Sequence, residues 1–192
     1  MFYTSKKVQL KIYYLFMLAD GKCSADEKEK FTSICKSMDV NDDEKKEVIG
    51  FCENLINVSG SDNSARVIRE ITNLLAEEGK GIFFGGSLNK NKCKQVESMW
   101  TLINLGYADA EYSEAEKKVV SFLTDYWEID APTLADLNDT AETVLALTRQ
   151  KDWVKTTNKP YDVVSANIAE IDEAVSRMAK NIEILISEAD VA

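Results

Sequence analysis

Two acidic segments of similar sequence hold the residues of this chain that are best suited to chemistry. They read ADGKCSADE at residues 19–27 and ADAEYSEAE at residues 108–116. In each segment a Ser precedes a Glu by three residues. This is the pattern of a capping box, in which the Ser hydroxyl accepts a hydrogen bond from the Glu N–H and the Glu carboxylate accepts one from the Ser N–H. Each segment therefore predicts a corner between two helices, with an Asp in the turn and a Glu in the first turn of the second helix.

The two corners together supply four carboxylates, those of Asp20, Glu27, Asp109 and Glu116. If the corners face each other across a pseudo-twofold axis, these oxygen donors could hold one hard divalent cation, calcium or magnesium, with backbone carbonyls and waters completing the coordination. The alternative is purely structural: Asp favours turns and Glu completes the capping boxes, and no metal is bound. Both interpretations stay open on the sequence alone.

The composition narrows the function classes. The 192 residues include no His, the usual proton shuttle and a common ligand of catalytic zinc, and no two of the four Cys have C-x-x-C spacing. No pair of carboxylates is selected by its spacing for hydrolysis, so we expect no catalytic residues and no enzymatic activity. The formal net charge of -10 argues against nucleic acid or an anionic membrane surface as the partner. It favours a basic protein or a cation.

We expect the chain to be cytoplasmic and to have no membrane span. Its N-terminal residues lack the charged start, long apolar run and small-residue cleavage site of a signal peptide. The apolar run at residues 8–18 is too short and too interrupted to cross a bilayer. Cys35 and Cys52 lie among apolar-periodic residues, where a reduced Cys acts as a small hydrophobic side chain.

Apolar residues recur at helical spacing in eight separable segments, and only two prolines occur, so the sequence predicts an all-α fold of about eight helices. The apolar positions that follow the two corners match, Phe31 with Val120 and Ile34 with Leu123. We therefore expect two related helical halves, residues 1–78 and 92–192, packed as one bundle. A Gly-rich loop at residues 79–91 connects them in what we expect to be one integrated domain.

Two apolar features could serve a partner. Ile82, Phe83 and Phe84 lie between glycines in the connecting loop. They are either tucked into the core or exposed as a partner-binding patch. In residues 161–187 apolar residues alternate at steps of four and three, the seam of a coiled coil. The stripe is broad, which favours packing on the body of the same molecule over self-association. The chain is thus a monomer or a homodimer through this last helix.

At the first corner, residues 15–27 (LFMLADGKCSADE) resemble the signature of the tellurite-resistance TerB-like superfamily. That signature is an apolar helix end, Ala-Asp-Gly, a short turn and a Glu that opens the next helix. The second corner looks like a degenerate copy in which Ala110 replaces the Gly. The resemblance implies an all-helical, non-enzymatic protein. It also implies divalent metal binding by Asp20 and Glu27 and, through the repeat, by Asp109 and Glu116.

The leading hypothesis is a bacterial TerB-like protein-interaction module, in which calcium or magnesium has a role, working in a stress-response or membrane-associated complex. The alternative is a small acidic immunity or antitoxin-type protein that inhibits a basic toxin by electrostatic complementarity. Both hypotheses place the function in binding a protein partner.

Overall fold

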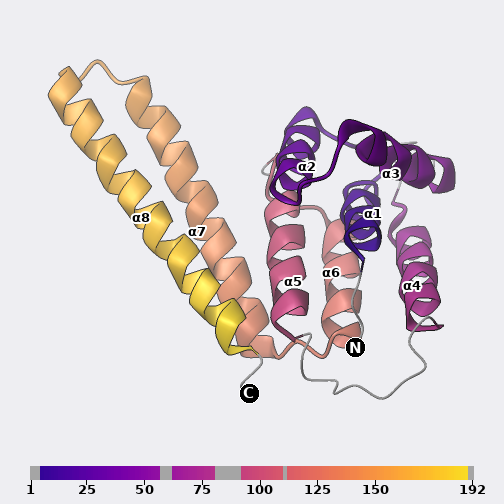
Figure 1. The fold of residues 1–192 in the computed structure, drawn as a ribbon. Coiled ribbons are helices and arrows are strands. Elements are labelled where there is room, and N and C mark those ends of the chain that lie inside the picture. Colours follow the sequence, from indigo (N-terminus) through magenta and orange to yellow (C-terminus); the bar gives the residue numbers. More distant parts are fainter. Residues whose placement is uncertain (1–4, 57–61, 81–91, 110–111, 190–192) are drawn as a thin grey trace.

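The computed structural model describes residues 5–56, 62–80, 92–109 and 112–189, and in them all regular structure is helical (Figure 1). The prediction of an all-α chain with about eight helices is confirmed for these residues. The helices are α1 (Lys6–Met17), α2 (Ala25–Ser37), α3 (Asp42–Leu55), α4 (Ser64–Lys80), α5 (Lys92–Gly106), α6 (Glu114–Tyr126), α7 (Ala131–Lys155) and α8 (Tyr161–Glu188).

Helix α1 is the centre of the body that α1 to α6 form. It contacts α2, α3, α4, α5 and α6, and every residue from 12 to 19 is buried. A helix that is apolar on all sides must be enclosed by other helices, because no side of it can face water without exposing apolar surface. The first turn of α1 is the exception and carries exposed lysines.

The helix starts follow from local sequence. Ser24, Asn41 and Ser113 are N-caps with complete capping boxes, closed by Glu27, Glu44 and Glu116. The N-cap of α7 is an Asp that accepts a hydrogen bond from the Thr133 N–H, and Pro132 occupies its first turn, where a missing N–H costs nothing. The corners predicted at Ser24 and Ser113 are therefore helix starts.

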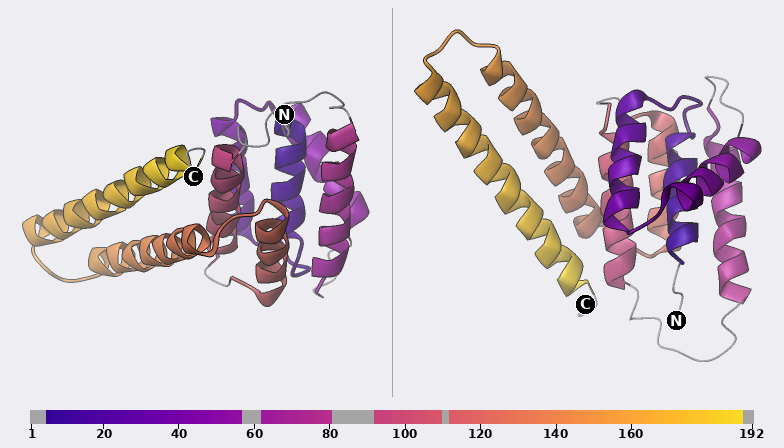
Figure 2. Two further views of the ribbon diagram at one scale, coloured as in Figure 1. Left: turned by 90° about the horizontal axis from the view of Figure 1, so that it is seen from below. Right: turned by 45° about the horizontal axis from the view of Figure 1, so that its top comes forward.

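The internal repeat relates α1 and α2 to α5 and α6. Helix α2 contacts α5 and α1 contacts α6, as a pseudo-twofold relation between the two pairs requires. The halves differ after that point. Helices α3 and α4 pack on α1, whereas α7 and α8 form an antiparallel hairpin that extends away from the body (Figures 1 and 2). We call this hairpin the arm.

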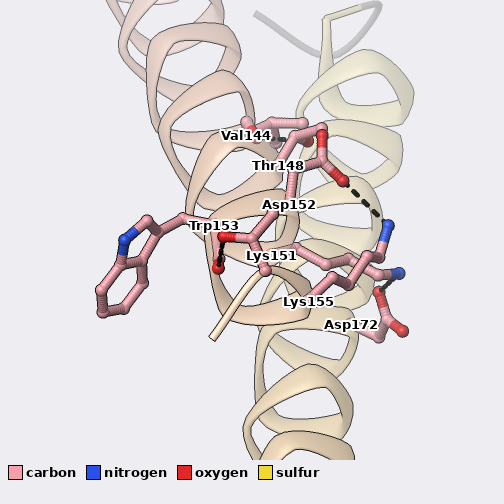
Figure 3. A network of polar contacts seen from close by, with 8 residues as sticks. Val144, Thr148, Lys151, Asp152, Trp153, Lys155 and Asp172 are labelled. Carbon is pink, nitrogen blue, oxygen red and sulfur yellow. Dashed lines mark hydrogen bonds and ion pairs between the residues drawn. The ribbon is translucent and has the colours of Figure 1, made fainter. Parts of the chain in front are cut away.

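The seam predicted for the last helix packs within the chain. Helix α8 lies along α7 and also contacts α5, and Ile171 and Ile182 are buried. Toward the far end of the arm, Lys151 of α7 forms an ion pair with Asp172 of α8 at 2.5 Å (Figure 3). Where α8 returns to the body, Leu185 and Ile186 pack against the main core. Hence the broad apolar stripe of α8 is divided between α7 and the body.

The predicted connecting loop falls mostly outside the described residues. Helix α4 continues to Lys80, two residues into the segment assigned to that loop. Ile82, Phe83 and Phe84 lie outside the described residues. No helix in the described part of the chain is both long enough and apolar enough to cross a membrane.

Candidate functional site

The two corners lie where the central helix pairs meet. Asp20 follows the end of α1, and Glu27 is in the first turn of α2; Asp109 follows the end of α5, and Glu116 is in the first turn of α6. The contacts of α1 with α5 and α6, and of α2 with α5, bring both corners to one region of the body. Lys30 of α2 strengthens this packing by donating to the Asn104 carbonyl oxygen of α5 at 2.6 Å.

The start of α4 holds the first corner in place. The Asn63 N–H donates to the Ala19 carbonyl oxygen at 2.7 Å, next to Asp20. The neighbouring Asp62 forms an ion pair with Lys118 of α6 at 2.6 Å, and this contact lowers the pKa of the Asp62 carboxyl. Residues 62 and 63 therefore contact both the first corner and α6, the helix that begins at the second corner.

The two glutamates of the corners are buried carboxylates. Glu27 is 5% exposed and Glu116 is 4% exposed. Oε2 of Glu27 accepts from the Ser24 N–H at 2.7 Å, and Oε2 of Glu116 accepts from the Ser113 N–H at 2.8 Å. Each capping box therefore uses one oxygen of its glutamate, in nearly the same geometry in both halves.

Burial and neighbouring charge raise the pKa of both glutamates. Loss of hydration is the main cause, and it raises the pKa of Glu27 to about 7 and that of Glu116 to about 8, against the cap hydrogen bonds, which lower them. Asp109 and Asp20 raise the pKa of Glu27 further; Glu27 and Asp20 do so for Glu116. Each glutamate is thus affected by at least one acid of the other corner.

The aspartates occupy the outer part of this region. Asp20 is half-buried, and its Oδ1 accepts from the Lys22 N–H at 2.8 Å, which stabilises a turn in which Gly21 has a φ of 77°. Asp109 is exposed. Among the ion pairs between described side chains, none includes Asp20, Glu27 or Glu116.

In the described residues no group of three or more His, Cys, Asp or Glu side chains is positioned to hold a metal ion. Both glutamates are turned back toward their own caps and Asp20 toward the Lys22 N–H, which explains why neighbouring acids are not arranged as a coordination shell. Cys23 adjoins the cluster, but burial raises the pKa of its thiol to about 11, with Glu27 adding to the effect. The thiol is therefore a poor metal ligand at neutral pH.

The sequence analysis did not identify the aromatic packing at the second corner. A Cβ added at Gly106 would lie 2.6 Å from Tyr112 Cδ2, so the ring of Tyr112 rests directly on the helix backbone. The Tyr112 and Tyr107 rings are 4.9 Å apart between centroids. Gly106, the last residue of α5, was the available signal, because glycine often marks a close approach to a backbone.

Beside these two tyrosines a hollow of about 330 Å³ opens between α6 and the base of α7. Its lining includes Tyr107, Tyr112, Val120, Leu134, Asn138 and Glu142. Oε1 of Glu142 accepts from the Tyr107 hydroxyl at 2.7 Å, which links the arm to the second corner. We refer to this feature as the α6–α7 hollow.

Comparison with known proteins places these features in a family. The family model described as "Tellurite resistance protein TerB" matches residues 12–139, well over half of the chain. The match runs from α1 through both corners and into the first third of α7. No curated protein and no solved structure matches the chain. The extent of the family match shows that the chain belongs to the TerB family of tellurite resistance proteins.

Proposed function

We propose that this chain is a non-enzymatic TerB-type module that binds a divalent cation at its paired corners and acts by binding a protein partner. The observation that carries the proposal is the pair of buried glutamates, whose pKa values are raised by burial and further by acids of the opposite corner. Burying acidic groups close to one another opposes folding, and a bound cation would reverse that cost.

The donor set fits a hard cation. All four candidate ligands, Asp20, Glu27, Asp109 and Glu116, offer carboxylate oxygens, which suit calcium and magnesium. The caps use Oε2 of each glutamate, so Oε1 is the atom left for a cation. In the proposed bound state, Asp20 and Asp109 turn their side chains toward the glutamates. The bound cation would supply positive charge there and would join the turn after α1 to the turn after α5.

Calorimetry with magnesium and with calcium tests the cation site directly. Deprotonated glutamates are the ligands, so binding near pH 7 should release protons. The heat of binding should then change with the ionisation enthalpy of the buffer. Asp20→Asn should remove the binding while keeping the hydrogen bond to the Lys22 N–H, because an Asn oxygen can accept it. Asp26→Asn, in the exposed first turn of α2, is the matched control and should bind as the parent does. Absence of binding and of proton release at millimolar metal would return the four acids to a capping and turn role.

Metal-dependent partner binding is tested separately. We propose that the partner belongs to a cytoplasmic stress-response assembly, an assignment supported by the tellurite-resistance description of the family. Parent and Asp20→Asn proteins used as bait in the presence of magnesium should recover different partners, and chelator should make the two recoveries alike. Identical recoveries under all conditions would contradict the role of the cation in partner binding. They would not change the conclusion that calorimetry gives about cation binding itself.

A further inference from the structure

Helix α7 carries a row of exposed residues, of which Glu142 also accepts a hydrogen bond from Tyr107 of the body. At helical spacing the row comprises Ala135, Asp139, Glu142, Ala146, Arg149 and Trp153, each of them exposed. Trp153 is 61% exposed, and its indole points away from α8 (Figure 3). An exposed Trp on a rigid helix is the residue type that most often dominates an interface when buried there. The row therefore has the character of a contact surface.

The charges of this row are divided between the two ends of α7. Asp139 and Glu142 lie near the body, whereas Arg149 lies near the far end of the arm. Between them the small side chain of Ala146 leaves room for another helix to approach. Glu142 and Arg149 form no ion pair with any side chain in the described part of the chain. A second α7 running antiparallel to the first would set each basic end against an acidic end.

The charges also select a register. In an antiparallel pair, Glu142 of each copy can be placed opposite Arg149 of the other copy. The same register places Trp153 opposite Asn138, which lines the α6–α7 hollow. Trp153 of one copy and the α6–α7 hollow of the other copy therefore lie at the same level of the paired helices.

The α6–α7 hollow suits an indole in size and in lining. Its volume of about 330 Å³ has room for a bicyclic ring, and Val120, Leu134 and Tyr112 give it apolar walls. The Asn138 amide nitrogen donates to the Leu134 carbonyl oxygen at 2.9 Å, so its oxygen is oriented as an acceptor that an indole N–H could use.

From the charge pattern, the exposed Trp153 and the hollow at the matching level, we propose that two copies of this chain associate through antiparallel α7 helices, each inserting Trp153 into the α6–α7 hollow of the other. The contact is isologous, so every pair occurs twice. Arg149 and Trp153 lie beyond residues 12–139, which match the TerB family model. It does not depend on the proposed cation.

A charge exchange tests the register. At about 100 μM, the range of a moderate association, the parent should sediment as a dimer. Glu142→Arg and Arg149→Glu should each place like charges together at both symmetric positions and weaken association by about tenfold or more. Mixed in equal amounts, the two variants should form a heterodimer, because each opposing pair then regains opposite charges. The double variant should form homodimers again. Lys180→Glu, on α8 of the same arm, is the matched charge-reversal control and should dimerise as the parent does.

Trp153→Ala tests the insertion of the Trp153 side chain independently of charge. This variant should be a monomer with unchanged circular dichroism. In the parent, the fluorescence of Trp153 should shift to shorter wavelength as concentration rises, a shift that Trp153→Phe removes while Trp100 and Trp127 remain. A parent that is monomeric at all concentrations would overturn the proposal. So would a dimer that survives Trp153→Ala, or a mixture of the two charge variants that stays monomeric.

Discussion

Replacing Glu116 by Gln should stabilise the protein in chelator. Gln keeps an oxygen that can accept from the Ser113 N–H but removes a carboxyl whose pKa rises from 4.5 to about 8 on folding. Each pKa unit corresponds to about 1.4 kcal/mol, and pH 7.5 is about three pH units above the unfolded value, so the parent loses roughly 4 kcal/mol at pH 7.5 by holding a proton that water would remove. For a chain of this size that corresponds to an increase in melting temperature of about 8–16 °C.

Thermal unfolding with and without metal separates the two roles of Glu116. A cation that binds only the folded parent at one hundred times its Kd adds about 2.7 kcal/mol to stability, so magnesium or calcium should narrow the difference in stability between parent and variant. Glu44→Gln is the matched control, because Glu44 closes the capping box of α3 with an exposed side chain. Its stability should be nearly that of the parent. A Glu116→Gln protein no more stable in chelator than Glu44→Gln would refute the reasoning from burial.

Three further outcomes follow from the same structure. The folded protein holds the protons of Glu27 and Glu116 more tightly than the unfolded chain does. Their joint contribution to the free energy of unfolding in chelator should therefore be largest below about pH 4.5 and should fall as the pH rises through about 7 and 8. Urea unfolding at a series of pH values measures this dependence, which should be much smaller in the variant with Gln at both positions. Gly106→Ala should lower the free energy of unfolding by about 1–3 kcal/mol, since its Cβ would meet Tyr112. Gly50→Ala, also in a helix but with no atom within 4 Å of an added Cβ, should instead raise it by about 1 kcal/mol; equal effects of the two substitutions would contradict the packing at the second corner.

The parts of the fold that the sequence predicted are those set by local interactions. The capping boxes at Ser24 and Ser113 depend on residues three positions apart, and both are present in the structure. The internal repeat led to the hypothesis that the four acids pool around one cation, with a purely structural role as the alternative. In the structure, acids of each corner raise the pKa of the glutamate in the other corner. The role of the four acids as metal ligands stays a prediction. The orientation of each carboxylate could not be predicted from the sequence, because the same side chain can serve a turn or cap, a cation, or both.

The arm could not be predicted from periodicity. The apolar residues of α7 include Leu137, which packs in the main core, and Val154, which is buried in the hairpin. A stripe of apolar residues shows that one side of a helix is covered but not that the covering partner changes along its length. The α6–α7 hollow and the exposed position of Trp153 depend on that change. Both were therefore visible only in three dimensions.

The enclosure of α1 has a consequence for synthesis on the ribosome. Helix α1 is made before the other helices of the body, yet it is the one that they surround in the finished protein. Some of its partners are made much later, since Gln9 donates to Ser98 across 89 positions of sequence. At about 5–20 residues per second, roughly 4 to 18 s pass between translation of the two residues. During that interval an apolar helix has only α2, α3 and α4 to cover it. The nascent chain thus exposes an apolar, aggregation-prone segment. Its protection depends on the speed of elongation and on chaperones near the exit tunnel.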